Sequence, residues 1–310
     1  MKAVKIKLSD FSSRPMRAFH LSWIAFFVCF FGWFGIAPLM PLVRDEFHLS
    51  KAQLGNVMIA SVAITVLARL LIGSLCDRFG PRRVYAGLLS LGALPVMGIG
   101  LAHSYTGFLI ARLLIGAVGA SFVVTQYHTS AMFAPNVVGT ANATAAGWGN
   151  LGGGVAQMVM PLLVAALLSF GLSPAHSWRV AMLVPGALML VLSVLYLRLT
   201  EDGPSGNRRI APGAERDTLR LDRPSAILDA TRDVRVWALA VMYGACFGVE
   251  LTIHNVAALY FRDRFQLSLA SAGFIAGLFG GLALFARALG GLCGDRAGQR
   301  FQLLPRHPGR

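Results

Sequence analysis

Eight long apolar segments limit what this chain of 310 residues can fold into. A helix needs about 20 apolar residues to cross the roughly 30 Å hydrocarbon layer of a bilayer. Because a backbone inside a bilayer must satisfy its own hydrogen bonds, helices are favoured over regular β structure. We therefore predict an all-α polytopic membrane protein. The predicted spans are residues 19–43, 52–75, 84–102, 107–131, 138–169, 178–198, 236–261 and 269–292.

Composition supports a membrane location. Only 14% of the residues are charged, against about 25% in soluble domains. The net charge of +14 does not indicate nucleic-acid binding, because the basic residues are distributed as topology signals. The four cysteines lie in or beside apolar spans without ligand spacing. Since no phosphate loop or nucleophile constellation is visible either, we expect no enzyme, cofactor or metal site.

The distribution of basic residues predicts the orientation. The N-terminal segment, the loop after the second span and the connection from Arg198 to Arg235 are rich in lysine or arginine, and that connection alone holds eight arginines. The loops on the other side carry fewer. Because positive charge favours the cytoplasmic side, we expect a cytoplasmic N-terminus and a location in the inner (plasma) membrane.

Two arginines inside apolar spans are the most informative single residues. Arg69 and Arg287 each lie eight residues before a D-R-x-G, and both segments fit A-R-x-L-x-G-x-x-x-D-R-x-G. An arginine at the centre of a membrane helix costs about 2.5–3.5 kcal/mol even on the lenient insertion scale. A chain that carries this cost twice, at matching places, is expected to use both charges, and an anion is the natural substrate.

The repeated segment also predicts the domain organisation. Residues 199–235 are polar and rich in proline and glycine, and they follow six spans. The eighth span therefore corresponds to the second span of another six-helix unit, so twelve helices are implied and eight are present. We expect the following parts: a cytoplasmic segment, 1–18; a six-helix bundle, 19–198; a linker, 199–235, with a short amphipathic helix near 224–233; two helices of a second bundle, 236–298; and an atypical basic tail, 299–310.

Several motifs carry a resemblance to a known family. The segment G-S-L-C-D-R-F-G-P-R-R, residues 73–83, resembles the helix 2–3 loop motif of the major facilitator superfamily, and R-L-L-I-G-A-V-G, residues 112–119, resembles its helix 4 motif. Within that superfamily, A-G-W-G-N-L-G-G-G-V-A-Q, residues 146–157, resembles the nitrate signature of the nitrate/nitrite porter family. Residues 248–255 are similar to helix 7 of that family's proton-coupled branch. The resemblance implies a secondary transporter that works by alternating access.

The arginines and the resemblance together imply an anion site. Each arginine lies about 12 Å along its helix from the aspartate of its motif, and the repeat places the two facing each other across a central cavity. A guanidinium offers paired planar donors and keeps its charge when buried, which suits nitrate. The resemblance adds ring and amide contacts to the site. The expected substrate-binding residues are Arg69, Arg287, Asn150, Phe122, Tyr243 and Phe247.

Other residues receive supporting roles. The glycines of the signature are expected to pack helices closely, to admit substrate, or both: Gly147, Gly149, Gly152, Gly153 and Gly154. The loop motifs are expected to act in gating: Gly73, Asp77, Arg78, Gly80, Arg82, Asp295 and Arg296. Asp77 and Asp295 are expected to cap or pair at the cytoplasmic helix ends. Arg112 is expected to be a hydrogen-bonded structural or gating residue.

The coupling mechanism is left open by the sequence. Proton symport needs a titratable group, and Glu250, His254 and His128 are the possible coupling residues. Nitrate/nitrite antiport needs none, because two anions alternate on one positive site. The resemblance of helix 7 favours symport. The expected partners are nitrate or nitrite, a proton as possible coupling ion, and the lipid bilayer, with no nucleic acid and a monomeric state.

Two alternatives to nitrate transport remain. The chain is either a carrier of another small anion, such as a carboxylate, or a truncated fragment that does not transport. The family continues into helices 9–12, whereas this chain ends F-Q-L-L-P-R-H-P-G-R. That ending is typical of a frameshift, an early stop or a fragment of a longer chain. We therefore expect poor transport by these 310 residues alone.

Overall fold

A computed structural model describes residues 2–207 and 231–303, and these residues are almost entirely helical. Eight helical stretches are long and apolar enough to cross a membrane, which confirms the predicted fold class. The chain falls into two compact units. The larger unit comprises residues 1–208 and 254–310, and the smaller unit comprises residues 209–253. Most of the amphipathic helix predicted near 224–233 lies outside the described residues.

In the described residues, the first six spans contain nine α-helices and three short 3₁₀ segments. The elements are α1 (Arg14–Phe34), η1 (Ala37–Leu39), α2 (Met40–Phe47), α3 (Lys51–Phe79), α4 (Pro81–Gly98), η2 (Ile99–Leu101), α5 (Tyr105–Ile115), η3 (Gly116–Ala120), α6 (Ser121–Met132), α7 (Val138–Ser169), α8 (Pro174–Ala181) and α9 (Leu183–Leu199). The fourth predicted span is therefore α5 and α6 joined by η3. The bounds of α7 agree with the predicted 138–169.

Two further spans follow the linker. They are α11 (Val234–Phe265) and α12 (Leu269–Leu303). Both run past the predicted spans, and α12 continues beyond the predicted domain end at residue 298. Hydropathy marks only the part of a helix that suits the lipid core, whereas helical hydrogen bonding continues into polar residues at the helix ends. This difference explains why several helices are longer than expected.

Local sequence signals set several helix ends. The N-terminus of α3 has a capping box, in which the Ser50 hydroxyl accepts from the Gln53 amide at 3.2 Å and the Gln53 side chain accepts from the Ser50 amide at 2.9 Å. Gly80 ends this helix with a φ of +82°, a backbone conformation that favours glycine. Pro81 then starts α4, which suits proline because the first helical residue needs no amide donor.

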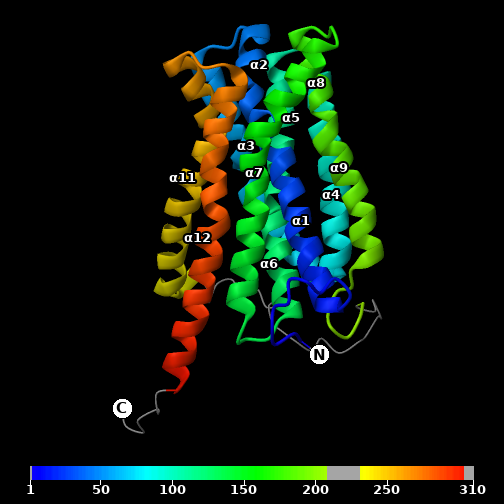
Figure 1. Cartoon of the computed structure of the whole chain (residues 1–310), viewed down its shortest axis with the longest axis vertical. Helices are drawn as coiled ribbons and strands as arrows, with labels where there is room; N and C mark the ends of the chain where they lie inside the picture. Colours follow the sequence, from blue (N-terminus) through cyan, green and yellow to red (C-terminus); the bar gives the residue numbers. More distant parts are fainter. Residues whose placement is uncertain (1, 208–230, 304–310) are drawn as a thin grey trace. The chain divides into compact units, whose positions relative to one another are not determined.

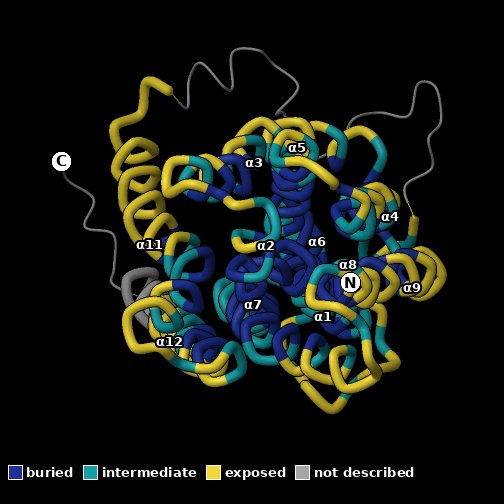
Figure 2. The backbone as a smooth tube through the Cα atoms, turned by 90° about the horizontal axis from the view of Figure 1, so that it is seen from above, coloured by how far each residue is buried: buried dark blue, intermediate teal, exposed yellow. Residues whose placement is uncertain are grey.

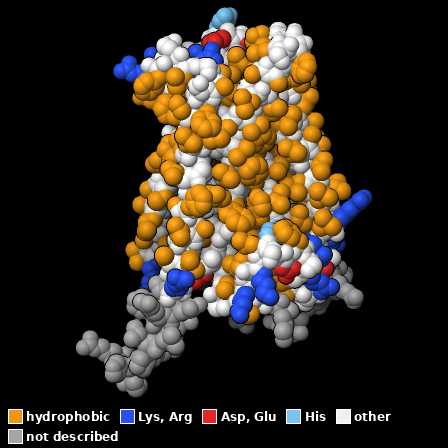
Figure 3. Space-filling model, in the orientation of Figure 1, with side chains coloured by type: hydrophobic (Ala, Val, Ile, Leu, Met, Phe, Trp, Pro, Cys, Tyr) orange, Lys and Arg blue, Asp and Glu red, His pale blue; other side chains and the backbone are white. Residues whose placement is uncertain are grey.

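Within the larger unit, the helices surround a buried centre. Helix α1 packs against α6 and α7, α4 packs against α9, and α12 runs along α7 (Figure 1). Figure 2 shows buried residues gathered where α1, α6 and α7 meet. The outward surfaces are apolar, with Leu70, Leu71 and Leu91 among the exposed side chains. Figure 3 shows this apolar surface between two ends that carry the charged residues. Such a distribution is that of a multi-pass membrane protein.

The larger unit has two ends, an N-terminal side and an opposite side. The N-terminal side carries residues 2–13, the α3–α4 turn and the α6–α7 loop. The opposite side carries the α2–α3, α4–α5 and α7–α8 loops. On the N-terminal side, residues 2–4 lie along the α6–α7 loop, where the Ala3 amide donates to the carbonyl of Met132 at 2.9 Å.

Candidate functional site

Arg69 and Phe122, two of the residues predicted to bind substrate, lie beside one another. Arg69 is half-buried on α3, and its guanidinium carbon lies 5.7 Å from the ring centroid of Phe122 on α6. The Phe122 ring lies 5.7 Å from that of Phe26 on α1. An aromatic face attracts a cation at this distance. Three helices therefore contribute to the position of the first arginine.

Arg287 lies on α12 in the neighbourhood of His254. It is half-buried, and it lies about two helical turns after Gly280, which is beside the His254 ring. The His254 ring lies 5.0 Å from the ring of Phe34 on α1 and 5.8 Å from that of Phe279 on α12. The His254 imidazole is thus bordered by aromatic rings from α1 and α12.

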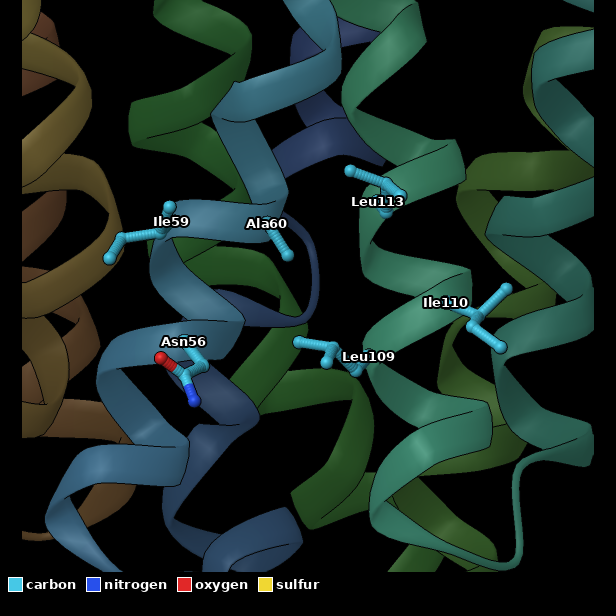
Figure 4. Close-up of a pocket in the computed structure, with 6 residues that line it drawn as sticks. All are labelled: Asn56, Ile59, Ala60, Leu109, Ile110 and Leu113. Carbon is cyan, nitrogen blue, oxygen red and sulfur yellow. The ribbon is translucent and has the colours of Figure 1, made fainter.

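Two apolar cavities lie elsewhere in the larger unit. The first, of about 250 Å³, lies between α3 and α5, and Asn56 is its polar lining residue (Figure 4). The second, of about 450 Å³, lies between α7 and α12 and is lined by Met158, Phe274 and Ser271 among others. Neither is lined by Arg69 or Arg287. These largely apolar linings do not suit a small hydrophilic anion, and the predicted cavity between the arginines stays a prediction.

The glycine signature allows close approach of α7 to two neighbours. A Cβ atom at Gly149 would overlap the Phe26 ring, and one at Gly152 would overlap the carbonyl oxygen of Phe27. On the other side, a Cβ at Gly154 would lie 3.0 Å from the Cα of Gly280 on α12. The signature therefore supports the packing role that small residues have in membrane helices.

Two signature glycines differ in their surroundings. Gly147 is buried in α7. A Cβ atom at Gly153 would lie 3.2 Å from the Phe34 ring and 3.3 Å from Cε1 of His254. Gly153 therefore lies beside an ionisable side chain.

The remaining residues predicted to bind substrate are divided between the two units. Asn150 is fully buried in α7. In the smaller unit, Tyr243 and Phe247 stack on one another with their ring centroids 5.1 Å apart and an interplanar angle of 22°. Their one-turn separation had predicted a shared face, and the stack agrees with it. Glu250 belongs to the same smaller unit.

A buried hydrogen-bond network surrounds Arg112. The Arg112 side chain is 1% exposed and donates to the carbonyl of Trp33 at 3.0 Å and to Oδ1 of Asn255 at 3.0 Å. The Ser61 hydroxyl donates to the same amide oxygen at 3.3 Å, and the Trp33 indole donates to the Ser61 carbonyl at 2.7 Å. The network joins α1, α3 and α5 to α11, so Arg112 has the hydrogen-bonded role expected of it.

Asn255 is predicted to stabilise this network. Changing it to alanine leaves the Arg112 guanidinium with one fewer acceptor in a buried position, so the free energy of unfolding should fall by about 1–3 kcal/mol. Denaturation of the purified chain in mixed detergent micelles measures the loss. The control is Asn56→Ala, which removes only an exposed hydrogen bond to Tyr105 and should cost less than about 0.5 kcal/mol. Equal losses in the two variants would contradict the assigned role.

The two copies of the loop motif make different contacts on the N-terminal side. Asp295 of the second copy accepts from the amide of Thr140 at 2.6 Å and from its hydroxyl, at the first turn of α7. A carboxylate is favourable there because of the helix dipole. Asp77 of the first copy accepts instead from the Tyr127 hydroxyl at 3.0 Å. The second copy therefore links α12 to α7, and this contact agrees with the expected cap.

The other motif residues make separate contacts. The Arg82 backbone amide donates to Asp202 at 3.1 Å, and its side chain donates to the Leu197 carbonyl at 2.8 Å. A Cβ atom at Gly80 would overlap the Asp202 carboxylate, and one at Gly73 would lie 4.0 Å from Val123. The Arg78 guanidinium lies over the Phe79 ring, and Arg296 is exposed.

His128 has a structural position. Its Nδ1 lies 2.6 Å from the Tyr196 hydroxyl, and its Nε2 lies 2.7 Å from the Glu201 carbonyl oxygen. The ring is fully buried between α6 and the end of α9. Because both nitrogens are occupied by structural partners, the geometry favours a packing role over the coupling role considered for it.

Sequence reasoning did not single out Gln157 or Asn255. Both are buried amides in apolar spans. Polar side chains in membrane helices mark protein-facing or functional positions. The presence of an amide in an apolar span could therefore have identified both residues from the sequence. Their partners depend on helix packing, which no motif specifies.

Comparison with known proteins identifies the family. The Major Facilitator Superfamily model matches residues 22–309. The high affinity nitrate transporter 2.5 of Arabidopsis thaliana is 40% identical over 301 residues, which cover 97% of this chain and 60% of that protein. The nitrate/nitrite transporter NrtP of Nostoc punctiforme is 34% identical, with 79% of this chain and 47% of that protein covered.

A solved structure shows the same fold. The bacterial homologue of the human lysosomal transporter Spinster, inward-facing and unoccupied, matches with a TM-score of 0.70 at 17% identity, covering 93% of this chain and 63% of that one. The chain spans about 60% of the length of the Arabidopsis relative. The chain belongs to the Major Facilitator Superfamily, and these matches confirm the predicted resemblance to its nitrate/nitrite porter family.

Proposed function

We propose that this chain forms part of a secondary carrier that moves nitrate or nitrite across the plasma membrane. The observation that carries the proposal is the pair of matching membrane arginines, Arg69 on α3 and Arg287 on α12, in a chain whose relatives include nitrate transporters. Residues 19–198 would form the first bundle, 199–235 the cytoplasmic linker, and 236–298 the beginning of the second bundle. The N-terminus would face the cytoplasm.

The proposed site binds the anion between the two guanidinium groups. Nitrate is planar and has only acceptor oxygens, so it can receive paired hydrogen bonds from each arginine. The Phe122 ring beside Arg69 would contact the flat face of the anion. The Asn150 amide would add a donor. Tyr243 and Phe247, in the smaller unit, remain predicted substrate contacts.

Alternating access would break and remake contacts at both ends of the larger unit. On the opposite side, Arg44 of α2 forms a 2.7 Å ion pair with Asp263 of α11. The Arg112 network also joins the first six spans to α11, through Asn255. On the N-terminal side, Asp295 caps α7. Each end therefore has polar contacts between the first six spans and the last two, and opening of either side must separate its own set.

A competition assay tests the substrate. The purified chain in detergent is titrated with nitrate by calorimetry, and binding is measured because it reports on the site without the rest of the transport cycle. We expect nitrite to displace nitrate, because the paired donors and flat rings fit a planar anion of this size. Acetate and formate should not displace nitrate, even at tenfold higher concentration. Equal displacement by the carboxylates would instead support a general carrier of small anions, and no binding of any of these anions would reject the proposed site.

A further inference from the structure

His254 is a buried ionisable side chain with an unusual lack of polar contacts. It is 1% exposed, and neither ring nitrogen has a hydrogen-bond partner among the described residues. A buried donor or acceptor left unsatisfied costs about 1–3 kcal/mol. His128, by comparison, has both ring nitrogens occupied. The contrast between two buried histidines of one chain suggests that His254 has a function beyond packing.

Neighbouring residues that the structure describes hold the His254 ring in place by close packing, without hydrogen bonds to it. A Cβ atom at Gly153 would lie 3.3 Å from Cε1 of the ring, and one at Gly280 would lie 3.5 Å from it. Phe34 and Phe279 cover the ring from α1 and α12. The helix glycines thus leave room for the imidazole. An added methyl group at Gly153 would press on the ring, whereas one at Gly280 would touch the ring and overlap Gly154.

A second unsatisfied polar atom belongs to the same region. Nε2 of Gln157 donates to the His254 backbone carbonyl at 2.6 Å. Its Oε1 atom has no hydrogen-bond partner within the described part of the chain, although the side chain is fully buried. A neutral imidazole has one N–H donor and one acceptor nitrogen, whereas a protonated imidazole has two donors. Protonation would therefore leave one donor for Oε1 of Gln157 and provide a second donor for an anion.

The charged side chains near His254 determine how readily a proton can be added to it. Arg287 is the cationic side chain that follows Gly280 by about two turns on α12, and Gly280 lies beside the imidazole. The neighbours contributed by α1 and α7, which are Phe34, Gly153 and Gln157, do not titrate. On its own helix, Glu250 precedes it by one turn. A second positive charge beside Arg287 is unfavourable in a buried site, whereas an anion at Arg287 would offset the repulsion.

We propose that His254 binds the coupling proton and that it does so together with the anion at Arg287. A lone pair of the ring nitrogen accepts a proton from water on the side where the anion enters. The resulting imidazolium donates one hydrogen bond to the anion and the other to Oε1 of Gln157. One proton and one anion together add no net charge to the site. When the anion leaves on the other side, the proton returns to water there. This inference rests on the proposed function.

Proton counting tests the inference. Nitrate binding to the purified chain is measured by calorimetry in two buffers of different ionisation enthalpy, so that the heat difference gives the protons taken up per anion. We expect close to one proton in the unchanged chain, and nitrate affinity should fall about tenfold for each unit rise in pH wherever the free imidazole is neutral. The variant His254→Gln should bind nitrate with no linked proton and no such pH dependence.

Controls separate the coupling role from a structural one. The variant His103→Gln, at an exposed loop position on the opposite side, should keep the full proton uptake. His254→Asn provides a smaller replacement if glutamine disturbs the fold, and it should show the same loss of uptake. Undiminished proton uptake in either His254 variant would overturn the inference. Nitrate binding without proton uptake in the unchanged chain would overturn it while leaving the proposed function in place, whereas no binding at any pH would reject both.

Discussion

Changing either Arg69 or Arg287 to lysine should lower the nitrate affinity of the chain by about 100-fold or more. Lysine keeps the positive charge but replaces a planar fork of donors with a compact ammonium. If the anion receives paired hydrogen bonds from each guanidinium, each substitution removes a bidentate contact that charge alone does not replace. The loss corresponds to about 2.7 kcal/mol or more, because each tenfold change in affinity is about 1.4 kcal/mol.

The measurement is a calorimetric nitrate titration of each variant. Arg264→Lys is the matched control, because Arg264 is exposed at the end of α11 and should bind nitrate as the unchanged chain does. A melting curve for each variant checks that the fold is kept. Affinities within about twofold of the unchanged chain in both lysine variants would show that the arginines contribute only general positive charge, or that the anion binds elsewhere.

Hydropathy and motifs predicted the fold because the bilayer imposes a strict length on each apolar span. The predicted bounds of α7 agree with the structure, and the break of the fourth span at η3 was missed. That break occurs in the segment G-A-V-G-A, where Gly119 lies against the Trp33 ring and a Cβ atom would overlap it. A contact between distant helices has no signature in the hydropathy of either one.

The candidate site was predictable to a lesser degree. The free-energy cost of a charged side chain in a membrane helix identified Arg69 and Arg287. The resemblance supplied Phe122, whose ring lies beside the Arg69 guanidinium. The histidines show where such reasoning stops, since His254 and His128 are equivalent as residues in apolar spans. Only the packing shows that His128 is held by Tyr196 and Glu201 while His254 lies among rings and glycines. Partners in space, rather than residue type, distinguish them.

Gly152→Ala should destabilise the chain more than a methyl group ordinarily does in a helix. The added Cβ would overlap the carbonyl oxygen of Phe27, which is backbone and cannot move to another rotamer. Helices α1 and α7 must therefore separate, and overpacking of this kind costs about 1–3 kcal/mol. Because α1 also carries Phe26 and Phe34, which contact Phe122 and His254, the separation should also weaken nitrate binding.

Gly55→Ala is the control for this substitution, and its expected effect has the opposite sign. Gly55 lies within α3, and nothing lies within 4 Å of a Cβ atom placed there. Alanine at such a position removes the entropic cost of glycine and should stabilise the helix by about 0.5–1 kcal/mol. Denaturation in mixed micelles compares the two variants. A gain of stability in both would show that α1 and α7 can separate without cost, and it would remove the packing role assigned to the signature.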